Sequence, residues 1–164
     1  MQNLKKTIVY KQNADTHRSL DFQVDEIATD FIYHPENLSL NTRYIKQLPE
    51  LDQDELKSGK STLGLCFTSK KHHLPGSNLE ITIPVRGDRH KFIGLVVFIR
   101  KIEQGYKTGI WLRSQTDACR ARILEQICYI DGYLENRQKQ SKVPINTDQE
   151  IEGWISRNAA LFPA

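Results

Sequence analysis

The sequence predicts a mainly β domain, an antiparallel barrel or sandwich of five or six short strands, with α-helices at its C-terminal end. Short segments in which apolar and polar residues alternate follow one another between residues 38 and 112, separated by turn residues. Beyond residue 113 the apolar residues recur at spacings of three and four, which is typical of helices. A chain of 164 residues has room for one such domain with terminal additions.

The strands are defined by this alternation and by the turns between them. The turn residues Glu103-Gln104-Gly105 should join the last two strands as a hairpin. The polar residues 47–60 are expected to form a connection, and residues 21–33 are ambiguous between a helical turn and a loop. Strands are expected at residues 38–44, 62–68, 78–85, 92–102 and 106–112.

The domain organisation follows from these elements. Residues 1–30 are expected to be a mobile basic arm in which only residues 8–10 have the apolar character of a short strand. Residues 31–113 should form the β domain. Residues 114–164 should form helices that belong to the same domain or serve as an oligomerisation or partner element.

The first C-terminal helix should begin after Ser114, because Ser114 and Asp117 have the spacing of a capping box. Its apolar stripe either packs on the β domain or forms a coiled-coil seam that makes an oligomer through residues 116–137. The stripe consists of Ile123, Ile127, Ile130 and Leu134. Pro144 ends this helix, and Thr147 with Glu150 forms a second capping box that opens a short helix.

Charge and composition exclude several classes of protein. The 23 basic and 20 acidic residues are interspersed and give a formal net charge of only +3, which argues against binding to duplex nucleic acid but leaves room for a local anion pocket. No apolar run reaches the roughly 18–20 residues of a membrane helix. Cys66, Cys119 and Cys128 have no CxxC spacing, so we expect three buried thiols and a cytoplasmic protein.

The search for catalytic motifs indicates no enzyme, metal or cofactor. Gly59-Lys60-Ser61 resembles the tail of a phosphate-binding loop but lacks the earlier glycine and precedes a strand. The pair His72-His73 could recruit a metal with Cys66, although a solvated turn is the better interpretation. A hydrolase using His90 or His34 is an alternative without a recognisable nucleophile.

The run Gly59-Lys60-Ser61-Thr62-Leu63-Gly64 resembles the second signature of the PilZ family, bacterial receptors for cyclic di-GMP. That signature reads (Asp/Asn)-x-Ser-x-x-Gly, and Ser61 and Gly64 match it. The turn at residues 74–77 and the later hairpin, with Gly94 and Gly109, are also similar to the family. The resemblance covers residues 31–135 and implies a six-stranded antiparallel β-barrel followed by a helix.

Two features depart from the family pattern. PilZ receptors carry an Arg-x-x-x-Arg motif before the first strand, whose guanidinium groups grip guanine and phosphate. The corresponding residues 30–36 contain no arginine, and Gly59 replaces the acidic or amide residue of the second signature. Charged hydrogen bonds contribute about 1.5–3 kcal/mol each, so direct binding must draw on other contacts.

The resemblance implies a non-enzymatic receptor or adaptor in cyclic di-GMP signalling. Its ligand contacts would come from Gly59, Lys60, Ser61 and Gly64, with Arg18 approaching from the basic arm. The alternative is a protein–protein adaptor that binds no nucleotide and acts through its C-terminal helices.

Overall fold

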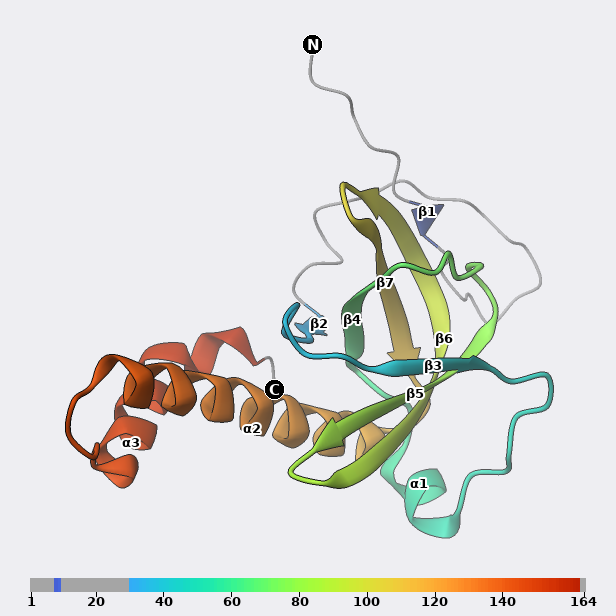
Figure 1. Ribbon diagram of the computed structural model, residues 1–164. Helices are drawn as coiled ribbons and strands as arrows, with labels where there is room; N and C mark the ends of the chain where they lie inside the picture. Colours follow the sequence, from blue (N-terminus) through green and yellow to red (C-terminus); the bar gives the residue numbers. More distant parts are fainter. Residues whose placement is uncertain (1–7, 10–29, 163–164) are drawn as a thin grey trace.

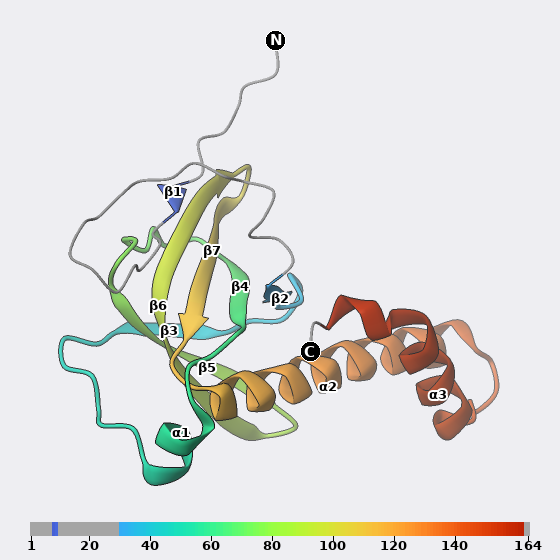
Figure 2. The same cartoon turned by 180° about the vertical axis from the view of Figure 1, so that it is seen from behind.

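The computed structural model describes residues 8–9 and 30–162, which form a curved sheet with helices at one end (Figure 1, Figure 2). The strands are β1 (Ile8–Val9), β2 (Phe31–Tyr33), β3 (Asn41–Tyr44), β4 (Gly64–Ser69), β5 (Asn78–Val85), β6 (Asp88–Ile102) and β7 (Gly105–Leu112). The helices are α1 (Gln53–Ser58), α2 (Gln115–Gln140) and α3 (Thr147–Asn158), followed by the short 3-10 turn η1 (Ala159–Leu161).

The strands form one mixed sheet in the order β2-β4-β7-β6-β5-β3, with β1 paired to β6. All pairs are antiparallel except β2 and β4, which run parallel. The edge strands β2 and β3 do not pair with each other, so the expectation of a closed, wholly antiparallel barrel is wrong. Pro35 follows β2 closely, and proline has no N–H to donate to a partner strand.

The predicted strand positions are close to the observed ones. The segment 78–85 is confirmed without change, and the hairpin at residues 103–105 is present between β6 and β7. The turn between β5 and β6 contains Arg86 and Gly87, whose φ angles of 51° and 87° are both positive, as a two-residue hairpin turn with the matching twist requires. The ambiguous stretch before Pro35 contains the short strand β2.

Helix α1 lies within residues 47–60, which were expected to form only a connection. Asp52 accepts a hydrogen bond from the backbone N–H of Glu55, while the Glu55 side chain accepts one from the backbone N–H of Asp52. This reciprocal capping box stabilises a helix of six residues that buries none of its side chains. Gly59 ends the helix with a φ of 81°, a conformation that favours glycine.

Helix α2 begins at the predicted Ser114 cap, whose hydroxyl accepts a hydrogen bond from the N–H of Asp117. Its buried face differs from the predicted stripe, because Ile123 is 57% exposed and only Ile127 and Ile130 of that stripe pack on the core. Small side chains let the helix approach the sheet closely. The apolar residues of the buried face are Ala118, Ala121, Leu124 and Cys128.

Helix α3 packs on the far end of α2, where α2 extends beyond the sheet (Figure 1, Figure 2). The helix starts one residue earlier than a Thr147 cap would give, because Asn146 is the residue that caps it. Trp154 and Phe162 are buried, with ring centroids 5.9 Å apart, and Phe162 also contacts Tyr129 of α2.

The core has two parts on opposite faces of the sheet. The larger part fills the inner face, where Leu65 and Phe67 of β4 meet apolar residues of β5, β6, β7 and α2. The smaller part, which we call the outer cluster, consists of Phe31, Cys66 and Phe98 with the partly buried Val97 and Trp111. Successive strand residues point to opposite faces, so Leu65 and Cys66 belong to different parts.

The structure bears on two predictions made from composition, the burial of the three cysteines and the lack of a membrane helix. Cys66 and Cys128 are buried as predicted, but the prediction is wrong for Cys119, which is exposed on α2. Within residues 8–9 and 30–162, no helix combines the length and apolar character needed to cross a bilayer.

Candidate functional site

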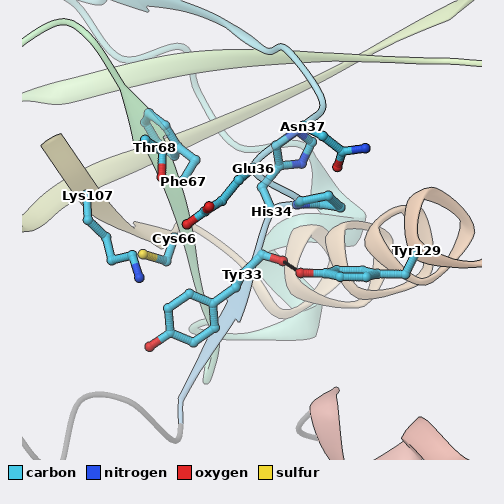
Figure 3. A pocket seen from close by; sticks show the side chains of 10 residues that line it. Tyr33, His34, Glu36, Asn37, Cys66, Phe67, Thr68, Lys107 and Tyr129 are labelled. Carbon is cyan, nitrogen blue, oxygen red and sulfur yellow. Dashed lines mark hydrogen bonds between the residues drawn. The ribbon is translucent and has the colours of Figure 1, made fainter. Parts of the chain in front are cut away.

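A pocket of about 290 Å³ opens where the segment after β2 faces strands β4 and β7 and helix α2 (Figure 3). Its wall is formed by residues 33–37, residues 66–68, Lys107 and Tyr129. This volume is near the lower end of the range for small-molecule sites, about 300–1,000 Å³. The pocket is therefore large enough for one ring-sized group but not for a large ligand in full.

Strand pairing places the polar side chains at this pocket. Tyr33 pairs with Cys66, and Thr68 pairs with Lys107 on the neighbouring strand. Paired residues point to the same face of a sheet, so these four side chains share the outer face. The Lys107 Nζ lies 5.2 Å from the centroid of the Tyr33 ring, a cation–π distance.

Helix α2 holds the segment after β2 in place through two side-chain contacts, one exposed and one buried. The Tyr129 hydroxyl donates a hydrogen bond of 2.5 Å to the carbonyl oxygen of Tyr33. Burial raises the pKa of Tyr129 to about 12, so this phenol keeps its proton and remains a donor. Figure 3 shows the bond crossing from the helix to the pocket wall.

The second contact joins His34 to Glu125, which is fully buried on α2. His34 Nδ1 lies 2.7 Å from Glu125 Oε1, and His34 Nε2 lies 3.2 Å from the carbonyl oxygen of Leu38. A carbonyl oxygen only accepts, so Nε2 must donate, and one more proton is shared between Nδ1 and the carboxyl group. Both ring nitrogens of His34 are thus engaged inside the protein.

These contacts argue against the hydrolase alternative, in which His34 would act on a substrate. A general base needs a ring nitrogen that can reach a substrate, and neither nitrogen of His34 is available for one. Burial raises the pKa of the Cys66 thiol to about 12, so Cys66 is not a thiolate nucleophile at neutral pH. His90 lies away from this pocket on β6, paired with Ile83 of β5. The geometry therefore favours a structural role for His34.

The residues singled out by the PilZ resemblance lie at a different place, between α1 and the start of β4. The Gly59 carbonyl accepts a hydrogen bond of 3.0 Å from the N–H of Gln115, at the start of α2. Lys60 is exposed. The Ser61 hydroxyl is buried, donates to the carbonyl of Leu63 at 2.8 Å and accepts from the Leu63 N–H at 3.1 Å. Arg18 lies outside the described residues.

Gly64 leaves space for a ring of the outer cluster. A Cβ atom at Gly64 would lie 2.2 Å from the Phe31 ring and 2.8 Å from the carbonyl oxygen of Ile110. Gly109 likewise leaves space for the ring of Phe98. None of Gly59, Lys60, Ser61 and Gly64 lines the pocket of Figure 3. Ser61 and Gly64 therefore shape the entry to β4.

Of the residues that line the pocket, sequence reasoning singled out His34 and Cys66, but not Tyr33, Lys107 or Tyr129. Lys107 could have been found by counting outward from the turn at residues 103–104, since the register of a tight hairpin is fixed by its turn. That count also places Arg100 opposite Lys107. No sequence signal indicates that Tyr129 meets Tyr33, because this contact depends on how α2 crosses the sheet.

The histidine pair in the β4–β5 connection differs from the predicted solvated turn. His73 is buried against the rings of Tyr44 and Phe67, and its burial lowers its pKa. His72 packs instead on Tyr106. In the part of the chain that the structure describes, no three His, Cys, Asp or Glu residues are grouped as metal ligands would be.

No protein-family model, curated protein or solved structure matches this chain.

Proposed function

We propose that this protein is a non-enzymatic regulatory module of the PilZ type, a receptor in bacterial cyclic di-GMP signalling. One observation carries the proposal. The resemblance depends on three stretches of chain: the Ser61–Gly64 segment, strand β7 and the helix that follows β7. These three stretches contact one another. Trp111 Nε1 donates to the Ser61 carbonyl at 3.1 Å, and the Gln115 N–H donates to the carbonyl of Gly59.

The contacts at Gly64 and Gly109 support the same proposal. The resemblance places glycines at both positions, and in this chain both glycines leave space for aromatic rings of the outer cluster. We take the curved, open sheet as a version of the family's six-stranded barrel in which β2 and β3 remain unpaired with each other. The ligand and the family are both part of the proposal.

The ligand chemistry requires cations. Cyclic di-GMP carries two phosphates and two guanines, and guanidinium or ammonium groups are the side chains that bind them best. No arginine stands at residues 30–36, so the charge must come from elsewhere. Lys60 is exposed near the Ser61–Gly64 segment and Arg18 belongs to the N-terminal arm, which makes both candidates for this role.

The test is calorimetric titration of the full chain with cyclic di-GMP at low and moderate salt. We expect saturable binding in the micromolar range that weakens as salt screens the charges. Linear GMP serves as the control for general nucleotide binding. The absence of heat up to millimolar cyclic di-GMP, with no change in the protein's fluorescence, would overturn the receptor proposal.

An adaptor function is the second candidate, favoured by the helices that project from the sheet (Figure 1). Three apolar side chains on or beside them are at least half exposed, namely Ile123, Val143 and Ile155. Large exposed apolar side chains of this kind are candidates for contact with a partner. We propose that this partner is another protein or a second copy of the chain bound through residues 116–137.

Sedimentation at increasing protein concentration tests the self-association form of this candidate. A monomer–dimer equilibrium that Ile123→Asp abolishes would favour it. A monomer at all concentrations would restrict the adaptor candidate to a different protein partner.

A further inference from the structure

Arg100 and Lys107 lie directly opposite each other on neighbouring antiparallel strands. Opposite residues in such a pair have Cβ atoms about 5 Å apart and point to the same face. Lys107 is also paired with Thr68 of β4, so the row Arg100–Lys107–Thr68 crosses three strands on the outer face. Two adjacent cations on one face form a local positive site.

No carboxylate among the described residues forms an ion pair with this positive site. Within the described ranges, no acidic side chain lies within ion-pairing distance of Arg100 or Lys107, whereas Arg43, Arg86, Arg120 and Arg137 each have an acidic partner. Like charges placed directly opposite each other in a sheet destabilise it. An anion bound between them would remove that repulsion.

The charges of Arg100 and Lys107 act on the pKa values of neighbouring side chains, Cys66 and Tyr33. Burial raises the pKa of the Cys66 thiol, while the charges of Lys107 and Arg100 act in the opposite direction. The charge of Arg100 also opposes the increase in the pKa of Tyr33 that burial causes. Both cations therefore act on the side of the pocket that contains Cys66 and Tyr33.

An aromatic ring stands beside the two cations. Tyr33 is 38% exposed, and Lys107 Nζ lies 5.2 Å from its centroid. Exposed aromatic rings stack on nucleobases, because every base presents a flat π face. The Glu36 carboxylate lies in the same pocket, beside Cys66 (Figure 3), and would repel a phosphate. A phosphate is thus favoured on the Arg100 side, away from Glu36.

We infer that Arg100, Lys107 and Tyr33 form a nucleotide site in which the two cations bind a phosphate group and the Tyr33 ring stacks on the base. The Thr68 hydroxyl, next to Lys107, supplies a further hydrogen-bonding group for the phosphate. The site shares no residue with the Ser61–Gly64 segment. The inference rests on the proposed function only for the choice of cyclic di-GMP among nucleotides.

The test compares the full chain with variants that each remove one contact. Cyclic di-GMP, GMP and inorganic phosphate are titrated separately by calorimetry. Arg100→Gln and Lys107→Gln should each weaken binding of the two nucleotides about tenfold, the effect of losing one charge-assisted contact. Lys101→Gln is the matched control, because Lys101 follows Arg100 on β6 and so points to the opposite face of the sheet, and it should leave the affinity unchanged.

Two further variants separate the roles of base and phosphate. Tyr33→Leu should weaken GMP and cyclic di-GMP but leave inorganic phosphate unchanged, since the Tyr33 carbonyl that binds Tyr129 is retained. Glu36→Gln should tighten binding of all three probes by removing the opposing charge. Thermal unfolding of each variant provides a folding control, and Arg100→Gln should be at least as stable as the wild type because a like-charge contact is removed.

The outcomes distinguish this inference from the proposed function. Cyclic di-GMP binding that is unaffected by Arg100→Gln and Lys107→Gln in folded variants would overturn the inference and leave the receptor proposal standing. GMP binding that depends on both cations, with no binding of cyclic di-GMP, would support the inference and overturn the receptor proposal. No binding of any probe would overturn both.

Discussion

The roles of single residues are clearest at Gly64, where a side chain has no room. A methyl group there would meet both the Phe31 ring and the carbonyl oxygen of Ile110, a backbone atom that cannot rotate away. Gly132 offers a matched contrast, because it lies within α2 and a methyl group added there would have no neighbouring atom within 4 Å.

Substitution of these two glycines should therefore have opposite effects. We expect Gly64→Ala to lower the free energy of unfolding by about 1–3 kcal/mol, the usual cost of overpacking. Gly132→Ala should raise it by up to about 1 kcal/mol, because alanine has the higher helix propensity. Urea unfolding measures both changes. Equal stability of Gly64→Ala and the wild type would show that the outer cluster is not packed as described.

The buried pair of His34 and Glu125 gives a second prediction at this scale. Leaving one partner of a buried pair alone is costly, so His34→Leu and Glu125→Leu should each lower the free energy of unfolding by about 3–5 kcal/mol. The double variant should be more stable than the sum of the single effects indicates. Glu135→Leu, on the exposed face of α2, is the control and should change stability by less than about 0.5 kcal/mol.

A double-mutant cycle from urea unfolding tests this coupling. Strictly additive costs would contradict a direct interaction between the two side chains.

The PilZ resemblance singled out Ser61 and Gly64 as ligand contacts, and this role stays a prediction. Their contacts with Leu63 and Phe31 depend on how the chain folds back, which a single sequence does not reveal. His34 was considered only as a catalytic residue, because its partner Glu125 lies on a distant helix.

At the scale of elements, features set by neighbouring residues were predicted correctly, whereas the faces through which elements pack were not. The Ser114 cap and the hairpin turn are local, and both are confirmed. Helix α1 was missed although Asp52 and Glu55 have capping-box spacing, because its polar composition is typical of a loop. The α2 stripe was assigned from large apolar residues, whereas the helix approaches the sheet through Ala118 and Ala121.

Helix α3 is attached to α2 through Glu150, and this attachment should depend on pH. The side chains of Arg137 and Tyr133 donate hydrogen bonds to the Glu150 carboxylate and lower its pKa. A carboxyl group with a lowered folded-state pKa stabilises the fold above its unfolded pKa, and this contribution is lost as pH falls through the folded value. We expect α3 to loosen below about pH 4.

The indole N–H signal of Trp154 in NMR spectra measures this loosening, since Trp154 is the buried residue of α3. Glu150→Gln should show the loosened signal already at neutral pH and no acid transition between about pH 6 and pH 3, that is, across the ordinary range of glutamate. A wild-type signal that is constant over this range would contradict the role of Glu150.

At the scale of the whole molecule, the antiparallel succession β5-β6-β7 could be predicted because short turns join these strands. The parallel pairing of β2 with β4 could not, since three residues are too few for a recognisable pattern. This pairing brings residues 33–37 beside β4, and α2 then completes the pocket wall. The pocket is thus a product of long-range topology, which a local motif such as residues 59–64 does not encode.

The most direct test of the receptor account is an NMR titration of the full, isotope-labelled chain with cyclic di-GMP. We expect the amide signals of residues 33–37, Thr68, Arg100 and Lys107 to shift together and to saturate, while α3 remains unchanged. Shifts confined to residues 59–64 would show that the ligand binds at the segment that resembles the PilZ signature, and would contradict the site at Arg100, Lys107 and Tyr33. No shift at millimolar ligand would contradict the receptor account itself.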